Sequence, residues 1–404
     1  MSDLGAWWQW EGELAKRLPG PSQPPVRVLA EWSLGMVLSR SCALSAVSLW
    51  WATVRGQAIW TVRQRLREWC YAAEQKRGVQ RRDLAVEDTF RPLLQWIADR
   101  WVGPQIALAL DATTLGERFV VLAISVVYRG CAIPVAWSVV PAGRKRAWRP
   151  EWERLLQRLR GALPAEWTVI VLADRGLYAR WLCRAIVDLG WHPFLRVNLG
   201  GTFRPGQQAR FRPFRSFVPE VDQRWAGAGT AFKGAASRLP CTLLAWHGPG
   251  YTDPWLILTD LPPETADVAW YGLRAWIEQG FKVTKRAGWQ WQRTRMTHPD
   301  RAARLWLAVA VATLWLVSVG GEADAADTDA SAPDFPALVV TSSRRRPATR
   351  LRLIGVFRRG WTSILAALFR NAPLPFASFH PEPWPALFLP PSHPQTLPLH
   401  SEAA

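Results

Sequence analysis

The residues best suited to chemistry are cations and a carboxylate on one helical face. At about 100° per residue, Tyr271, Arg274, Glu278 and Lys285 fall within a roughly 60° arc. A carboxylate can hold a divalent metal, and neighbouring Arg and Lys side chains can hold phosphate oxygens. This face therefore suits a backbone phosphate that is being cut. For these residues alone, a solvated helix face with Arg–Glu pairing worth about 0.2–0.5 kcal/mol is the alternative.

Two more acids each follow a run of apolar residues that predicts a buried strand. Asp111 comes after residues 106–110, and Asp174 comes after residues 167–173. Because ligands gather at the carboxyl ends of strands, these two acids and Glu278 predict an acidic trio at one edge of a sheet. Two magnesium ions about 3.5–4 Å apart would neutralise three carboxylates at close quarters. For either aspartate alone, a strand cap or a turn is the alternative.

The order of elements around these acids predicts an α/β fold. Short turns join three apolar runs into antiparallel strands, and a helix, a strand, a second helix and a last strand follow. The predicted elements are strands at 106–111, 119–127 and 132–140, a helix at 150–159, a strand at 167–174, a helix at 177–189 and a strand at 192–197. This is the element order of a ribonuclease-H-like fold, and we assign residues 101–198 and 266–320 to that catalytic core.

An all-helical domain is predicted before this core. Residues 1–100 carry apolar side chains at helical spacing. A short turn at residues 54–58 contains a glycine, and the helix after it carries Arg63, Arg65 and Arg67. The pattern resembles a helix-turn-helix, whose second helix enters the major groove of DNA. A helical bundle with a basic face explains it equally well, and both interpretations stay open.

A β-rich insertion is predicted between the two parts of the core. Residues 199–265 are rich in Gly, Pro and Arg and contain short apolar runs. Trp225 in this segment could stack on a DNA base, although packing inside the protein is the commoner role for a tryptophan. We therefore predict a packing role for Trp225.

The C-terminal region, residues 321–404, changes composition again. A small, acidic stretch at residues 320–334 predicts a disordered linker. A basic element at 343–347 leads into a predicted amphipathic helix at 351–369. The tail from residue 373 onwards is Pro-rich and predicts irregular structure.

Composition limits the class of protein. With 404 residues and 49% hydrophobic residues, the chain can form two or three domains. A formal charge of +18 and a pI near 10.8 predict binding to polyanions, with nucleic acid favoured over an anionic membrane surface. Five scattered cysteines without metal-ligand spacing indicate a reducing compartment and no disulfide framework. No signal-peptide pattern opens the chain, and the apolar run at 305–320 predicts a buried core helix.

These residues together resemble a known family. The segment 271–285 matches the pattern Y-(2)-R-(3)-E-(6)-K without a gap, Asp111 lies in LALDATTLG and Asp174 lies in VLADRG. The chain looks like an insertion-sequence transposase of the DDE class, in the branch with this motif, the insertion-sequence-four family. The resemblance covers roughly residues 30–320.

The resemblance implies metal-dependent DNA cleavage and strand transfer at the ends of an insertion sequence. Asp111, Asp174 and Glu278 would be catalytic and would hold two Mg²⁺ ions, for which Mn²⁺ can substitute. The implied partners are double-stranded DNA with terminal inverted repeats, target DNA and a second copy of the chain in a synaptic dimer. The implied place is the bacterial cytoplasm, at the nucleoid and away from membranes. The residues expected to contact DNA are Tyr271, Arg274, Lys282, Lys285 and Arg175.

Two other functions stay open at this point. One is a ribonuclease-H-like DNA nuclease that cuts without joining. The other is a non-catalytic DNA-binding protein derived from a transposase, against which the intact acidic trio speaks.

Overall fold

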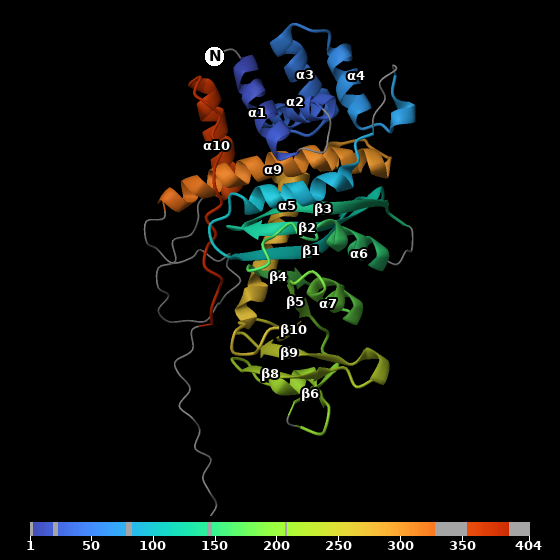
Figure 1. Cartoon of the computed structure of the whole chain (residues 1–404), viewed down its shortest axis with the longest axis vertical. Helices are drawn as coiled ribbons and strands as arrows, with labels where there is room; N and C mark the ends of the chain where they lie inside the picture. Colours follow the sequence, from blue (N-terminus) through green and yellow to red (C-terminus); the bar gives the residue numbers. More distant parts are fainter. Residues whose placement is uncertain are drawn as a thin grey trace, which may run out of the picture.

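The computed structural model describes residues 3–18, 23–77, 83–143, 148–206, 208–327 and 354–387, which form a mixed α/β protein around one ten-stranded sheet (Figure 1). The α-helices are α1 (Asp3–Arg17), α2 (Gln23–Ser39), α3 (Leu44–Arg55), α4 (Ile59–Trp69), α5 (Phe90–Ala98), α6 (Arg149–Arg158), α7 (Arg180–Val187), α8 (Ala275–Lys282), α9 (Pro299–Asp327) and α10 (Val356–Phe369). The strands are β1 (Gln105–Leu115), β2 (Phe119–Tyr128), β3 (Cys131–Pro141), β4 (Thr168–Ala173), β5 (His192–Arg196), β6 (Thr202–Pro205), β7 (Arg212–Pro213), β8 (Arg224–Ala231), β9 (Leu239–Trp246) and β10 (Trp255–Thr259).

The sheet runs in the order β3-β2-β1-β4-β5-β10-β9-β8-β6-β7. β1, β2 and β3 are antiparallel neighbours, whereas β4 is parallel to β1 and β5 is parallel to β4. Tight turns suffice between the first three strands, while α6 and α7 provide the longer crossovers that parallel strands need. The predicted order of three antiparallel strands, helix, strand, helix and strand is confirmed.

Strand β1 is longer than predicted. It does not end at Asp111 but continues to Leu115, because residues 112–115 stay paired with β2 as far as Phe119. The prediction that Asp111 closes a strand was therefore wrong, since the apolar run ends there and the backbone pairing does not. On the other side, pairing with β4 stops one residue before Asp111. Asp174 does follow the last residue of its strand, as predicted.

The segment predicted as a β-rich insertion extends this same sheet. β10 pairs antiparallel with β5, and β9, β8, β6 and β7 follow outwards. In Figure 1 these strands form the end of the sheet opposite to the N-terminal helices. Trp225 on β8 packs inside an aromatic cluster, with its ring 4.5 Å from that of Phe217 and 5.8 Å from that of Phe203.

Helix α9 lies between the N-terminal helices and the sheet (Figure 1). By length and composition it could cross a membrane, yet 89% of its apolar window is buried inside the protein. The apolar side chains of this window instead pack against the other elements, as expected for a core helix. The predicted buried helix is confirmed and is longer than the apolar run that predicted it.

Helices α9 and α10 cross in direct backbone contact. A Cβ atom on Gly320 would stand 2.6 Å from the backbone nitrogen of Gly360, and a Cβ on Gly360 would overlap the backbone of α9. Only glycine permits this approach, because any side chain would force the helices apart.

The prediction of a disordered linker from residue 320 was wrong for its first part. Helix α9 continues to Asp327, and residues 328–334 lie outside the described part of the chain, as do residues 343–347. Ion pairs explain the extension. The Asp324 carboxylate lies 2.6 Å from Nη1 of Arg129, and Arg359 on α10 pairs with both Asp324 and Asp327.

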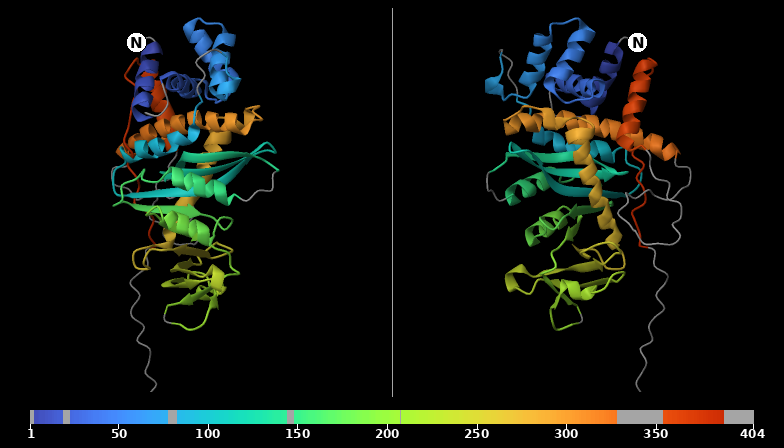
Figure 2. Two further views of the ribbon diagram at one scale, coloured as in Figure 1. Left: turned by 45° about the vertical axis from the view of Figure 1, so that its right-hand side comes forward. Right: turned by 180° about the vertical axis from the view of Figure 1, so that it is seen from behind.

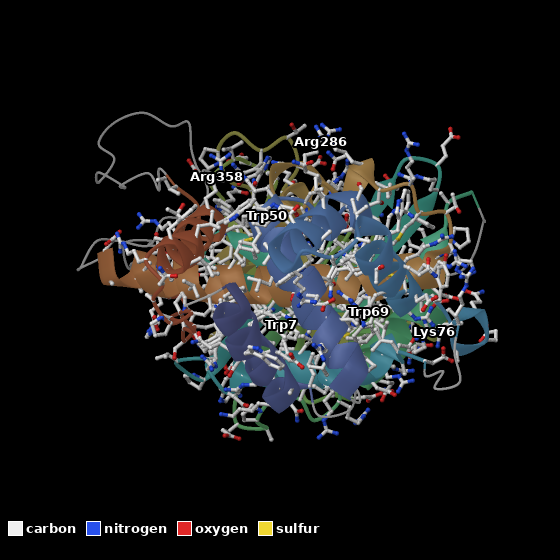
Figure 3. The ribbon with its side chains drawn as sticks, turned by 90° about the horizontal axis from the view of Figure 1, so that it is seen from above. Trp7, Trp50, Trp69, Lys76, Arg286 and Arg358 are labelled. Atoms are coloured by element: carbon white, nitrogen blue, oxygen red, sulfur yellow. The ribbon has the colours of Figure 1, made fainter. Side chains whose placement is uncertain are left out.

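The N-terminal helices cover α9, as seen from above in Figure 3. Gly56 closes α3 with a φ of 59°, a left-handed conformation that glycine adopts readily, and α4 follows after a short turn. Arg65 on α4 lies 2.9 Å from the buried carboxylate of Glu31, which Arg55 also contacts. Arg65 is therefore tied to the interior, which leaves Arg63 and Arg67 as the arginines of α4 that the helix-turn-helix interpretation can use.

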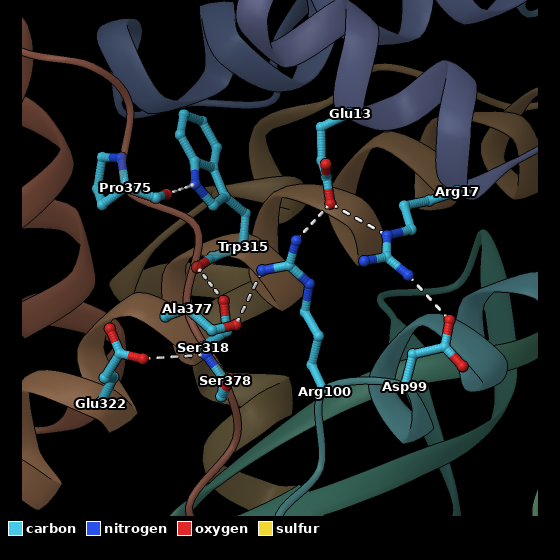
Figure 4. A network of polar contacts seen from close by, with 10 residues as sticks. All are labelled: Glu13, Arg17, Asp99, Arg100, Trp315, Ser318, Glu322, Pro375, Ala377 and Ser378. Carbon is cyan, nitrogen blue, oxygen red and sulfur yellow. Dashed lines mark hydrogen bonds and ion pairs between the residues drawn. The ribbon is translucent and has the colours of Figure 1, made fainter.

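Beyond α10 the chain forms a strap, residues 371–387, that runs back along the side of the protein (Figures 1 and 2). The strap has no helix or strand, as predicted, but its backbone is held at many points. Figure 4 shows Trp315 donating to the Pro375 carbonyl at 2.9 Å and Arg100 donating to the Ala377 carbonyl at 3.3 Å. Within the same network the Ser378 amide donates to Glu322 at 3.1 Å.

The centre of the strap is locked to the sheet. Phe379 is fully buried and exchanges backbone hydrogen bonds with Arg100 and Val102, at 2.7 and 2.9 Å. Its ring packs 5.2 Å from that of Tyr128, at the end of β2. Next along the chain, the buried Arg129 guanidinium donates to the His380 carbonyl at 2.7 Å. His380 thus takes part in this contact through its backbone carbonyl.

We expect Phe379→Ala to lower the free energy of unfolding by about 3–5 kcal/mol, because it leaves a cavity where the strap meets the sheet. Phe369→Ala is the matched control, since that ring is 84% exposed at the end of α10. Chemical unfolding of both variants measures the difference. Equal stability of the two variants would show that the strap does not hold the fold.

Candidate functional site

Strand register brings the two predicted aspartates together. Leu110 on β1 pairs with Ala173 on β4, and Ala173 pairs with Leu195 on β5. The next residue on each strand is therefore Asp111, Asp174 and Arg196, respectively. Neighbouring strands lie about 4.8 Å apart, so these three side chains form a row across the carboxyl ends of the parallel strands.

One guanidinium connects all three predicted acids. Nη2 of Arg274 lies 2.9 Å from Oδ2 of Asp111 and 3.4 Å from Oδ2 of Asp174. Nη1 of Arg274 lies 3.2 Å from Oε1 of Glu278. The Arg274 side chain is 14% exposed, whereas those of Asp174 and Glu278 are 41% and 57% exposed. The acids predicted from separate segments thus meet at one partly open point, with Arg274 between them.

The segment that carries Arg274 and Glu278 crosses the sheet on the face turned away in Figure 1 (Figure 2, right). It begins as a 3-10 helix, continues as α8 and ends as a π-helix, at Val268–Arg274, Ala275–Lys282 and Val283–Ala287. The uniform helical spacing assumed from the sequence therefore holds only within α8. Gly280 lets α8 lie directly on β3, because a Cβ atom there would stand 2.8 Å from Cβ of Ala132.

The start of this segment is fixed by Asp267 and the strap. Oδ1 of Asp267 accepts from the Ala269 amide at 2.8 Å, which caps the first turn. Oδ2 accepts from the Leu387 amide at 2.9 Å. Trp384 of the strap packs edge-on against Trp270, with ring centres 4.7 Å apart. The strap thus helps to fix the helical segment that supplies two of the site residues, Arg274 and Glu278.

Tyr271 lies inside the protein, in the 3-10 helix that precedes α8. Its side chain is 5% exposed and packs edge-on against Trp255, with ring centres 5.2 Å apart. Burial raises the pKa of the Tyr271 phenol to about 12, although the charges of Arg274 and Arg196 oppose the shift. The Arg196 guanidinium lies over the phenol ring, with its central carbon 5.9 Å from the ring centre, so Tyr271 is a buried neighbour of this site cation.

The other residues predicted to contact DNA do not join the cluster of Arg274 and the three acids. Lys282 is exposed at the end of α8, and Lys285 is half-buried in the π-helix. Burial lowers the pKa of the Lys285 amine, and the neighbouring Arg286 lowers it further. Arg175, next to Asp174, pairs with Asp253 at 2.7 Å and so ties the turn after β4 to the β9–β10 connection.

Burial and like charge act together on Asp111. Burial raises the pKa of its carboxyl group. Arg274 and the Ala112 amide oppose this shift, while the charges of Asp174 and Glu278 add to it. Three carboxylates around one guanidinium leave an excess of negative charge, and oxygen donors suit Mg²⁺ or Mn²⁺. The donor set therefore fits a divalent metal, although no three His, Cys, Asp or Glu side chains of the described residues are already arranged to hold one.

Sequence reasoning missed Arg196, Asp253 and Asp267. Arg196 was detectable, because it directly follows an apolar run in the same way as the two aspartates. Asp267 stands where an N-cap is expected, before the Glu278 segment. For Asp253 no local pattern exists, since its partner Arg175 is far away in the sequence.

Comparison with known proteins relates the chain to transposases. The model of the family described as "Transposase DDE domain" matches residues 108–315, slightly more than half of the chain and all three acids. Several solved structures are similar, among them a cryo-EM structure of a piggyBac transposase synaptic complex with hairpin DNA. That chain is 10% identical over 78% of this chain and 71% of its own length, with a TM-score of 0.37. No curated protein matches the chain.

We expect Asp111→Asn to raise the midpoint of thermal unfolding at neutral pH, because the uncharged amide avoids the cost of burying the ionised Asp111 carboxylate. Folding raises the pKa of Asp111 above its ordinary value. At pH values between these two pKa values, the folded chain keeps a proton on Asp111 that the unfolded chain has lost. The free energy of unfolding of the wild type therefore falls as pH rises through that window. The difference in unfolding midpoint between Asp111→Asn and the wild type should increase as pH rises between the two pKa values and stay constant at higher pH.

Thermal unfolding at a series of pH values measures this difference. Glu264→Gln, which changes an exposed acid outside the site, is the control and should show no gain. A destabilised Asp111→Asn protein at neutral pH would contradict the expectation.

Proposed function

The chain belongs to the transposase DDE domain family, and from this premise we propose that it cuts DNA at the ends of an insertion sequence and joins the ends to target DNA. One observation carries the proposal: Asp111, Asp174 and Glu278, which are distant in the sequence, meet at Arg274. We further propose the branch with the Y-(2)-R-(3)-E-(6)-K pattern, the insertion-sequence-four family. Segment 271–285 supports this assignment by its unbroken spacing.

The catalytic core is proposed to be ribonuclease-H-like, formed by residues 101–198 and 266–320. The strand order β3-β2-β1-β4-β5, with Asp111 and Asp174 directly after the last parallel pair of β1 and β4, supports it. Residues 199–265 are then an insertion that lengthens the sheet, and residues 1–100 a helical DNA-binding domain.

The three acids would hold two Mg²⁺ ions, or Mn²⁺ in their place. Bound metal would activate water or a 3′ hydroxyl and stabilise the leaving oxygen in phosphoryl transfer. The protein contributes the positions of the ligands. Asp111 and Asp174 are held by strand register, and their Oδ1 atoms each accept a backbone amide, from Ala112 and Gly176, at 2.8 and 2.9 Å. Their Oδ2 atoms face Arg274 and the site.

Cations around the acids are proposed to hold the DNA backbone. Lys282 is exposed and Lys285 is half-buried with a lowered pKa, so a phosphate beside Lys285 would relieve its unfavourable charge. Because its phenol is buried, Tyr271 would not touch DNA itself but would help to position Arg274 in the same helical segment. Arg175 would hold the turn after Asp174 through Asp253, in addition to any DNA contact.

The proposed partners follow from this chemistry and from the charge of +18. They are the terminal inverted repeats of the element, target DNA and a second copy of the chain in a synaptic dimer. The proposed place of action is the bacterial cytoplasm, at the nucleoid. Inverted repeats flanking the coding sequence would provide the DNA for every assay below.

We expect Asp111→Ala, Asp174→Ala and Glu278→Ala each to reduce cleavage and strand transfer by more than about a hundredfold, because each removes a metal ligand. Paired element ends, a target plasmid and Mg²⁺ provide the assay, with Glu264→Ala as the control outside the site. Variants as active as the wild type would refute the site. Wild-type cleavage without joining would indicate a nuclease instead of a transposase.

Lys285→Ala should weaken DNA binding and reduce the slope of log affinity against log salt by about 1, since one phosphate contact is lost. Its Mn²⁺ affinity should not fall, because Lys285 is not a metal ligand. Lys16→Ala, which removes an exposed lysine on α1, should leave both quantities unchanged. Reduced Mn²⁺ affinity in Lys285→Ala would contradict this separation of roles.

A further inference from the structure

Arg274 is bound to the acids in an unusual way. Arginine and a carboxylate usually form two parallel hydrogen bonds, which are strong because the two planar groups match. Here Nη2 is shared between Asp111 and Asp174 at 2.9 and 3.4 Å, and Nη1 reaches Glu278 at 3.2 Å. Nε is buried and has no hydrogen-bond partner. The guanidinium thus touches three carboxylates without a matched pair to any of them.

The charges at this point do not balance. Three carboxylates surround one guanidinium, because an oxygen of each lies within 3.4 Å of an Arg274 nitrogen. As noted above, the acids of the described chain are not arranged to hold a metal by themselves. Arg274 therefore lies where a cation is needed, and the three carboxylates are arranged around its guanidinium.

The guanidinium also has a route out of this position. Arg274 is 14% exposed, but two of its three partners, Asp174 and Glu278, are 41% and 57% exposed. Both are therefore accessible from solvent. A phosphate offers two oxygens that match the guanidinium fork, which the shared contacts with the acids do not.

We propose that Arg274 is an exchangeable counter-ion that neutralises the three acids in the free protein and moves to a DNA phosphate in the complex. Its departure would leave the carboxylates free to hold divalent metal. DNA binding and metal binding would then strengthen each other, because both require the same movement of one side chain. This inference rests on the proposed function, since it assumes that the three acids are the metal ligands.

The test is Mn²⁺ binding to the full-length protein without DNA, followed by electron paramagnetic resonance of the free ion. We expect Arg274→Met to bind Mn²⁺ at least about tenfold more tightly than the wild type, because the competing charge is gone and the apolar stem is kept. Arg286→Met is the matched control, since it removes an exposed cation from the same helical segment without touching the acids. Its affinity should stay within about twofold of the wild type, as expected for an exposed charge.

A second measurement adds a short DNA duplex of arbitrary sequence. The duplex should raise the Mn²⁺ affinity of the wild type and leave that of Arg274→Met almost unchanged. If Arg274→Met binds Mn²⁺ no more tightly than the wild type, Arg274 organises the acids for metal and the inference is refuted. If neither the wild type nor Arg274→Met binds Mn²⁺, with or without DNA, the proposed metal site itself fails. Thermal unfolding of each variant identifies a loss of folding. Arg274→Gln, which also removes the charge, replaces Arg274→Met where that variant does not fold, with the same expected outcomes.

Discussion

The contact of one guanidinium with three carboxylates is the interaction on which the arrangement of this protein depends. Asp111 and Asp174 come from neighbouring parallel strands, whereas Glu278 and Arg274 come from a helical segment on one face of the sheet. Coulomb repulsion would separate three acids this close unless a cation stood among them. Arg274 supplies that charge, so the site can be assembled before any ligand arrives.

Contacts from several parts of the chain place that helical segment relative to the strands. Gly280 sets its distance from β3, and Asp267 fixes its first turn through a helix cap. Asp267 also accepts from Leu387, so the last described residue of the strap bears on the position of Glu278. The strap is also anchored at Phe379 and Arg129, and its Leu374 amide donates to Gln9 of α1 at 2.9 Å. The strap therefore contacts the N-terminal helices, the sheet and the helical segment of the site.

The sequence predicted those features that local patterns determine. Apolar runs predicted β1 to β5 and α9, and the spacing of acids after these runs predicted that Asp111 and Asp174 would be neighbours. Local patterns did not show that β1 continues past Asp111, because the apolar run is broken there by Asp111, Thr113 and Thr114, which pairing with β2 holds in the strand. They also did not reveal the strap, whose partners Tyr128, Arg129 and Asp267 are more than a hundred residues away.

The role of Arg274 shows why a motif alone is insufficient. From the spacing, Arg274 was expected to hold phosphate, with Glu278 as a metal ligand beside it. In the folded chain, the same guanidinium also contacts both aspartates, which no pattern within 271–285 contains. Holding three carboxylates around one point lowers stability unless their charge is offset, and a permanent offset would block metal binding. A counter-ion that can leave meets both requirements, and an arginine next to DNA is suited to leave because phosphate offers it a better-matched partner.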